Sequence, residues 1–207
     1  MTRFRAAVEN DIPRLADIAA MAFLENPLFL YLFGGTANLV KKGSAYFSFV
    51  FRGGFRNGYI TVAGDPACGF IISVPHSAKL YSLRTELGAG AARLPFTCGP
   101  AVIARSLRFE RILTALRRQY LPPEHLYVYL LGVLPGFRKQ GIGAALLGKA
   151  ATSALEKGFP VALETMTPEL AAYYRKRGFT STGSRHFPEA DLELFGMVKE
   201  SGSGVNV

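Results

Sequence analysis

The chain has 207 residues, 49% of them hydrophobic, which suits one domain with a substantial buried core. Its formal net charge of +9 favours partners that carry several negative charges, but the sequence has no nucleic-acid-binding motif, so we expect no nucleic-acid partner. Cys68 and Cys98 form no CxxC pair and indicate neither a zinc site nor a disulfide framework, so no metal is expected.

We predict a single domain over residues 1–200, followed by a small, polar and flexible tail over 201–207. The first residues lead into a polar stretch rather than an apolar export signal. The longest charge-poor run, Asn26–Val40, is broken by proline and glycine and is too short to span a membrane. We therefore expect a cytoplasmic protein with no membrane partner.

The N-terminal half predicts helices around a pair of strands. Asp11 is a candidate N-cap and Pro13 lies in the first turn of a helix whose apolar residues recur at helical spacing up to Phe23. Gly53 and Gly54 are expected to follow the end of the second helix. The expected segments are a strand over Phe4–Val8, helices over Asp11–Phe23 and Ala37–Phe51, strands over Tyr59–Ala63 and Cys68–Val74, and a mostly helical, basic insertion over about 76–124.

The C-terminal half gives stronger signals. Leu126–Val133 is an apolar run with β-branched and aromatic residues, typical of a strand buried on both faces. Thr167 is a candidate N-cap with Pro168 at the first helical position. The expected segments are that strand, a helix ending at Gly158, a strand over Val161–Met166, a helix from Thr167 to Gly178, and a strand pair over Phe179–Ser184 and Leu192–Val198. The order β-α-α-β-β-(α)-β-α-β-α-β-β predicts an α/β fold of the α+β type, with a mixed sheet and helices on both faces.

The turn after Leu126–Val133 has the features of an anion site. The first turn of a helix leaves backbone N–H groups unpaired, and the helix dipole adds positive potential there. Gly141 and Gly143 remove side chains that would keep a diphosphate from the backbone, and Arg138 and Lys139 add positive charge. A turn whose glycines only satisfy backbone geometry remains an alternative.

Two nucleotide-binding alternatives fit the turn less well. Leu146 stands where a dinucleotide-binding GxGxxG pattern needs its third glycine. The sequence also contains no GxxxxGK[ST] phosphate loop.

The stretch from Leu131 to Ala144, with the pattern Leu-Gly-Val-x-Pro-x-x-Arg-x-x-Gly-x-Gly-Ala, resembles the coenzyme A signature of the GCN5-related N-acetyltransferase (GNAT) superfamily. A second landmark agrees, because Leu163–Thr165 and Tyr173–Phe179 are similar to that family's Leu-Glu-Thr and Phe-Tyr-Glu-Arg-Leu-Gly-Phe segments. The layout most resembles puromycin N-acetyltransferase and its bacterial relatives, including an acid before a proline at Glu25–Pro27. The resemblance implies a GNAT-type acyl-CoA N-acyltransferase fold.

The sequence departs from the family pattern at two positions. Lys139 stands where many members have glycine, and Leu170 stands where relatives often place an asparagine that contacts the coenzyme. The lysine is tolerated because Gly141 and Gly143 still let the cofactor approach the backbone closely. The leucine puts one polar contact to the cofactor in doubt.

The resemblance also implies acetyl-CoA as the cofactor and direct attack by the acceptor amine in a ternary complex. The backbone N–H of Val133, where the strand is expected to splay from its neighbour, would stabilise the oxyanion. The residues expected to bind the cofactor are Leu131, Val133, Arg138, Lys139, Gln140, Gly141, Ile142, Gly143, Ala144 and Tyr174.

Tyr174 matches the family tyrosine and is the expected general acid, because a phenol is protonated at neutral pH. Tyr173 is about 100° further around the helix and is expected to point away from the thioester. Glu164 is a candidate general base, acting directly or through water, and equally a structural carboxylate; Glu25 is a second candidate base. The three histidines, His76, His125 and His186, are expected to be structural or solvated.

We therefore expect an N-acetyltransferase that acts on the amine of a small molecule. The sequence does not identify the acceptor, although an aromatic-rich set would suit a flat or apolar amine as well as a core: Phe29, Tyr31, Phe33, Tyr46, Phe47 and Phe49. A catalytically inactive acyl-CoA-binding sensor of the same fold is the alternative. The sequence leaves open whether the protein forms a homodimer.

Overall fold

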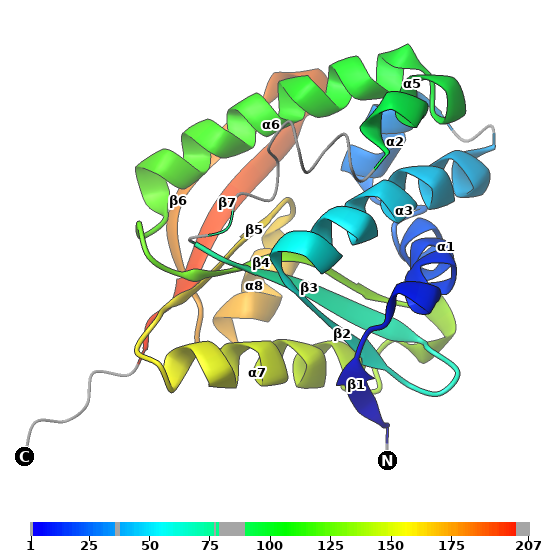
Figure 1. The fold of residues 1–207 in the computed structure, drawn as a ribbon. Coiled ribbons are helices and arrows are strands. Elements are labelled where there is room, and N and C mark those ends of the chain that lie inside the picture. Colours follow the sequence, from blue (N-terminus) through cyan, green and yellow to red (C-terminus); the bar gives the residue numbers. More distant parts are fainter. Residues whose placement is uncertain (1, 36–37, 77, 79–89, 202–207) are drawn as a thin grey trace, which may run out of the picture.

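A computed structural model of the chain describes residues 2–35, 38–76, 78 and 90–201. Its centre is a seven-stranded sheet in the order β1-β2-β3-β4-β5-β7-β6 (Figure 1). Every neighbouring pair is antiparallel except β4 and β5, which are parallel. The strands are β1 (Phe4–Ala6), β2 (Tyr59–Ala63), β3 (Gly69–Pro75), β4 (Leu126–Val133), β5 (Val161–Thr165), β6 (Thr180–Phe187) and β7 (Leu192–Lys199). This mixed sheet confirms the predicted fold class.

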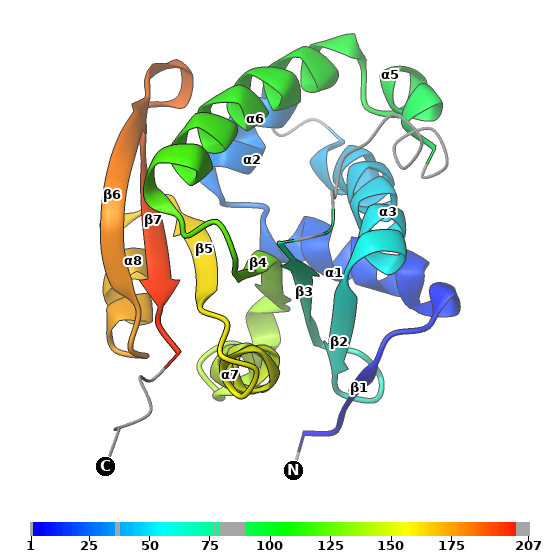
Figure 2. The same cartoon turned by 60° about the vertical axis from the view of Figure 1, so that its left-hand side comes forward.

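Helices cover both faces of the sheet (Figures 1 and 2). One layer holds α7 and α8, and the other holds α1, α2, α3 and α6, with α6 lying across the β6 and β7 side. The helices are α1 (Ile12–Ala22), α2 (Pro27–Phe33), α3 (Leu39–Asn57), α5 (Leu94–Thr97), α6 (Pro100–Tyr120), α7 (Ile142–Leu155) and α8 (Pro168–Arg175). Short 3₁₀ turns span Glu9–Asp11, Ala91–Arg93, Pro135–Phe137 and Pro188–Ala190.

The N-terminal half corrects several predicted boundaries. The helix α2 was not predicted, although its signals are local: Asn26 accepts a hydrogen bond from the N–H of Phe29 at 3.2 Å, and Gly34 ends the helix in the left-handed region at φ 68°. The predicted strand from Phe4 ends at Ala6. Asp11 occupies the predicted N-cap position of α1 but makes no capping hydrogen bond with its side chain, because its carboxylate accepts from both terminal guanidinium nitrogens of Arg5, at 2.6 and 2.7 Å.

Gly53 and Gly54 do not end the second helix, which begins at Leu39 and runs through both glycines to Asn57. A Cβ on Gly54 would lie 3.1 Å from Ile72 of β3. The missing side chain of Gly54 therefore lets α3 approach the sheet closely, whereas a Cβ on Gly53 would meet nothing within 4 Å.

The C-terminal predictions hold more closely. Leu126–Val133 is a strand over the predicted residues, and Thr167 caps α8 by accepting from the N–H of Leu170 at 3.2 Å. The prediction that β4 is buried on both faces is wrong, since only Val128 and Gly132 of its residues are buried. Except for Ser201, the predicted tail lies outside the described residues, as do 77 and 79–89 of the predicted insertion.

Within the part of the chain that the structure describes, no single helix is long and apolar enough to cross a membrane. The bent helix pair Glu9–Ala22 and Pro27–Phe33 passes the test of length and composition only when taken together.

The core between α3 and the sheet predicts a stability effect. The rings of Phe51 and Phe70 are both fully buried and meet edge to face with centroids 4.9 Å apart. Replacing Phe51 by alanine should lower the free energy of unfolding by about 3–5 kcal/mol, because the side chain is lost and a cavity remains. Phe96→Ala is the matched control, since that ring is 91% exposed and its loss should change stability by about 0.5 kcal/mol or less. Urea unfolding of both variants measures the difference, and equal effects would contradict this account of the core.

Candidate active site

The strands β4 and β5 separate along their length. Their parallel pairing is confined to Leu126↔Val161 and Tyr127↔Ala162, after which the two strands diverge. A one-residue bulge at Tyr129 interrupts the pairing of β4 with β3 on the other side. The bulge changes which residues face each layer, so that Tyr127, Tyr129 and Leu130 all line the cavity on the α6 side. This divergence agrees with the expectation that the end of β4 splays from its neighbour.

The loop that follows β4 leads into the N-terminus of α7. Residues 135–141 are exposed, and the first-turn N–H groups of Ile142, Gly143 and Ala144 have no backbone acceptor among the described residues. Gly141 precedes α7 at φ 80°, a conformation that a residue with a side chain adopts only with strain. Lys139 has φ 62°, which explains why glycine suits this position in relatives.

Gly143 is a glycine that the fold itself does not require. A Cβ there would meet only the hydroxyl of Tyr173, at 3.6 Å, and the side chain of Val133, at 3.8 Å, which are ordinary contacts. Its φ is not in the left-handed region. The absence of a side chain leaves the exposed amides open to a ligand, so the residues present fit the diphosphate of a coenzyme A.

Arg138 links the loop to a distant helix. Its Nη2 donates to the carbonyl oxygen of Ala22, at the C-terminus of α1, at 2.6 Å, and its Nε donates to that of Val133 at 3.4 Å. The guanidinium is exposed and lies where the dipole of α1 favours a positive charge. It therefore fixes the loop against α1 as well as adding charge. The side chain of Gln140 donates to the carbonyl of Gly136 within the same loop.

The two adjacent tyrosines of α8 have different surroundings. The hydroxyl of Tyr173 lies beside Gly143 and Val133, although its side chain was expected to point away from the cofactor. Arg177 stacks over the Tyr173 ring at 3.4 Å and donates to the carbonyl of Tyr173 at 2.7 Å, which fixes this orientation. Tyr174 packs against Phe179, and burial raises the pKa of its phenol to about 12. Its hydroxyl therefore stays protonated at neutral pH and is able to donate.

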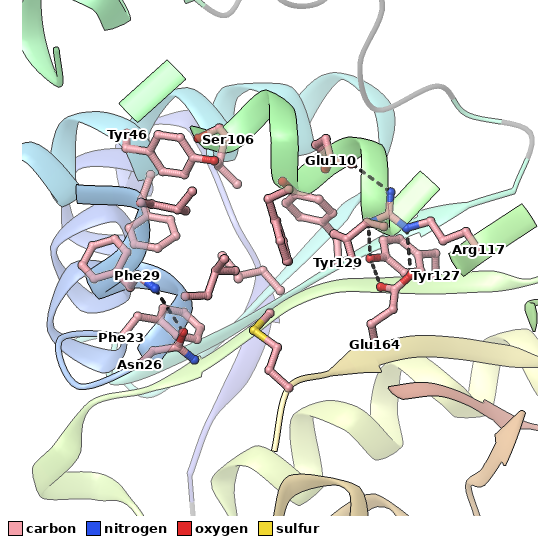
Figure 3. Close-up of a pocket in the computed structure, with 18 residues that line it drawn as sticks. Phe23, Asn26, Phe29, Tyr46, Ser106, Glu110, Arg117, Tyr127, Tyr129 and Glu164 are labelled. Carbon is pink, nitrogen blue, oxygen red and sulfur yellow. Dashed lines mark hydrogen bonds and ion pairs between the residues drawn. The ribbon is translucent and has the colours of Figure 1, made fainter. Parts of the chain in front are cut away.

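Glu164 lies on β5 two residues after Ala162, the last residue paired with β4, and is held in a polar network (Figure 3). Its Oε1 accepts from Nε of Arg117 at 2.8 Å, and its Oε2 accepts from the hydroxyl of Tyr127. Arg117 also donates to the Tyr127 hydroxyl at 2.7 Å and lies 3.4 Å from Glu110. The Glu164 side chain is only 4% exposed, so this network compensates a carboxylate removed from water.

The same network shifts the proton affinities of its members. Burial raises the pKa of Glu110, and burial also raises the pKa of Tyr127 well above its usual value. The negative partners raise the pKa of Arg117 despite its burial, so the guanidinium stays charged. One cation thus faces two carboxylates at one end of the site.

A cavity of about 130 Å³ lies between β4, β5 and the helices α2, α3 and α6. Figure 3 shows the polar network at one end and an aromatic group at the other, with Phe23, Phe29 and Asn26 facing the same space. A second cavity of about 540 Å³ adjoins it and shares six lining residues: Tyr46, Ser106, Glu110, Arg117, Tyr127 and Tyr129.

Of the remaining sequence candidates, His125 lies against the network: its ring meets that of Tyr127 with centroids 6.1 Å apart, and it lines the larger cavity together with His76. Glu25 is exposed and does not line the cavity, although its neighbour Asn26 does. His76 and His125 approach each other through a backbone hydrogen bond, and burial lowers the pKa of His125. His186 is half exposed, next to Asp191. Leu170 is 42% exposed on the first turn of α8.

Comparisons with known proteins agree with this geometry. Residues 107–179 match the model of the acetyltransferase (GNAT) family. A Corynebacterium glutamicum structure described as histone acetyltransferase HPA2 and related acetyltransferase is 21% identical, with a TM-score of 0.72 over 99% of this chain and 98% of that chain. The ribosomal-protein-S18-alanine N-acetyltransferase of Escherichia coli is 14% identical, with a TM-score of 0.57 over 100% of this chain and 99% of that chain. Arylalkylamine N-acetyltransferase 2 of Aedes aegypti is also 14% identical, with a TM-score of 0.58 over 97% of this chain and 99% of that chain.

Residues 107–179 thus carry the likeness to the GNAT acetyltransferase family, and the fold of the whole chain is similar to that of acetyltransferase structures. The separated parallel strands and the glycine-containing loop before α7 are where the predicted coenzyme signature lies. The more specific likeness to puromycin N-acetyltransferase stays a prediction.

Sequence reasoning did not identify three members of the polar network: Glu110, Arg117 and Tyr127. Glu110 and Arg117 are seven residues apart on α6, which places both on one helical face, but nothing in the sequence shows that this face meets β5. Tyr127 sits in an apolar strand and has no distinguishing local pattern.

The network predicts that two neighbouring arginines, Arg117 and Arg118, contribute differently to the free energy of unfolding. Arg117→Ala would leave Glu164 buried with an uncompensated charge and should lower the free energy of unfolding by about 3 kcal/mol, at the low end of the range for buried pairs because Arg117 is 24% exposed. Arg118→Ala, on the exposed side of the same helix, should change it by about 0.5 kcal/mol or less. Thermal unfolding of the two variants tests this difference. Equal stability would mean that the ion pair contributes nothing.

Proposed function

We propose that the protein transfers the acetyl group of acetyl-CoA to the amine of a small molecule, by direct attack in a ternary complex. The observation that carries the proposal is the divergence of β4 and β5, since the exposed α7 amides lie on one side of the sheet and the cavity opens on the other. The two reactants would therefore approach the gap from opposite faces.

The loop before α7 would hold the coenzyme. The exposed first-turn amides of α7, with Arg138 and Lys139 beside them, suit a diphosphate. Leu131 and Val133 on β4 would contact the remaining part of the cofactor. When bound, acetyl-CoA supplies an activated thioester. The N–H of Val133 is our proposed donor to the oxyanion.

Glu164 has a positioning role in this proposal. Both of its oxygens already accept hydrogen bonds, from Arg117 and from Tyr127. Taking a proton from the amine would require one of these bonds to break, so we assign Glu164 to orienting Tyr127 and Arg117 at the edge of the gap. Proton removal through water remains compatible with this role.

A sensor that binds the cofactor without turnover is not favoured. The chain retains a protonated phenol at the family position, Tyr174, and a cavity reaching the opposite side of the gap. A sensor requires neither feature.

The cofactor site is tested with two glycines of the same helix. Gly143→Glu should abolish coenzyme A binding, because it places a side chain and a negative charge against the proposed diphosphate site. Gly148→Glu is the matched control, since Gly148 is exposed in the middle of α7 and a Cβ there meets nothing within 4 Å. Calorimetric titration with coenzyme A measures both. Equal binding by the two variants would place the coenzyme elsewhere.

The general acid is tested with the two tyrosines. Tyr174→Phe should lower kcat by about 10²–10⁴ without changing coenzyme affinity, because a general acid contributes about that factor. Tyr173→Phe should reduce kcat by a much smaller factor. Turnover is measured at saturating acetyl-CoA, with the melting temperature of each variant. If Tyr173→Phe causes the larger loss, the tyrosine whose hydroxyl lies beside Gly143 is the acid and our assignment is wrong.

A further inference from the structure

Two carboxyl groups, those of Glu110 and Glu164, line the polar end of the 130 Å³ cavity, and they differ in the number of hydrogen bonds that they accept. Glu164 accepts hydrogen bonds on both oxygens. Glu110 has one contact, from its Oε2 to Arg117 at 3.4 Å, and none of the described residues donates to its other oxygen. Because Arg117 is shared between both acids, the end of the cavity carries one more carboxyl group than cation, and burial raises the pKa of Glu110. A cationic group of a ligand would favour the ionised carboxylate of Glu110.

Glu110 is placed to meet such a ligand. Its side chain is 31% exposed and lines both the small cavity and the larger one beside it. The Oγ of Ser106, one turn earlier on α6, is buried against the same space beside Tyr46. The α6 face over the cavity thus presents an incompletely paired carboxyl group.

The opposite end of the cavity is apolar and aromatic. Phe47 lies between Phe23 and Phe29, with ring centroids 5.6 and 5.4 Å away, and Val50 and Leu113 line the same space. No charged side chain other than those of Glu110, Arg117 and Glu164 lines the cavity in the described part of the chain. The ligand that fits must therefore carry its charge at one end only.

The volume limits the apolar part of the ligand. An engineered apolar cavity of about 150 Å³ binds benzene, so about 130 Å³ holds roughly one ring. A polyamine would place further cations among phenylalanines, and a peptide would need an open groove.

We propose that the acceptor is a small primary amine carrying one aromatic or alicyclic ring. Its ammonium is received by Glu110, and its ring fills the end formed by Phe23, Phe29 and Phe47. Glu110 is then the residue that selects a cationic ligand over a neutral one of the same shape. This inference rests on the proposed acetyl transfer to an amine and names the class of that amine.

The test measures binding rather than turnover, using the full chain and calorimetry. The probes are 2-phenylethylamine, its neutral counterpart 2-phenylethanol, and spermidine. Wild type should bind phenylethylamine at least about 10-fold more tightly than phenylethanol, because a hydrogen bond to a charged partner contributes about that factor or more. Spermidine should bind more weakly than phenylethylamine. Equal binding of the amine and the alcohol, or tighter binding of spermidine, would overturn the proposal.

Variants assign the selectivity to Glu110. Glu110→Gln should weaken phenylethylamine binding by about 10- to 100-fold and leave phenylethanol within about 2-fold. Glu189→Gln, at an exposed turn, should change neither. Melting temperature and coenzyme A affinity confirm that each variant is folded. Val50→Phe keeps Glu110 and fills the apolar end, so it should weaken both ring compounds. Unchanged phenylethylamine binding in either cavity variant would refute the site.

The same titrations separate this inference from the proposed function. If phenylethylamine binding does not depend on Glu110, the proposed acceptor class is refuted, even if some other amine is acetylated. Glu110-dependent binding without any acetylation by acetyl-CoA refutes the proposed transfer and leaves the amine site standing.

Discussion

The structure depends on one interruption of its central sheet, where the parallel strands β4 and β5 stop pairing after Tyr127 and Ala162. A continuous sheet would separate its two faces completely, since backbone and side chains fill it. Here the two strands diverge, with the loop before α7 in one layer and the cavity in the other. The bulge at Tyr129 adds to this effect, because it turns two successive residues of β4 toward the cavity.

The gap is stabilised by a polar network rather than by apolar packing. Tyr127 on β4 donates to Glu164 on β5, and Arg117 holds both from α6. A buried ion pair of this kind contributes little net stability compared with an apolar replacement, but it fixes the groups that form it. Here the network connects α6 to both β4 and β5. Desolvating these charges costs free energy, and the network orders the side chains where β4 and β5 no longer pair.

The network also gives the cavity its polarity. Two carboxylates and one guanidinium stand at one end of a space that is otherwise lined by phenylalanine and aliphatic side chains. Both oxygens of Glu164 accept hydrogen bonds because Arg117 lies closer to Glu164 than to Glu110 and because Tyr127 donates to Glu164. The difference between the two glutamates therefore follows from their positions relative to Arg117 and Tyr127.

The sequence by itself determined the elements whose signals are local. The apolar strand Leu126–Val133, the capped helix after Thr167 and the glycine pattern before α7 depend on residues that are neighbours in the chain, so periodicity and capping chemistry predict them. The family signature lies in the same local stretches, which is why the fold class followed from it. Gly54 does not end its helix as predicted, because a helix-ending glycine and a glycine at a close helix–sheet contact look the same in sequence.

Only the tertiary structure decided which side chains share the site. Glu110, Arg117, Tyr127 and Glu164 come from one helix and two strands, and their meeting depends on how α6 crosses the sheet. Likewise, adjacent tyrosines on α8 differ by a rotation about the helix axis, and the placement of α8 beside α7 is what brings the hydroxyl of Tyr173 next to Gly143. Local sequence fixes the direction of a side chain relative to its own element. The position of that element relative to the others is set by the burial of its whole apolar face, which involves residues far apart in the chain.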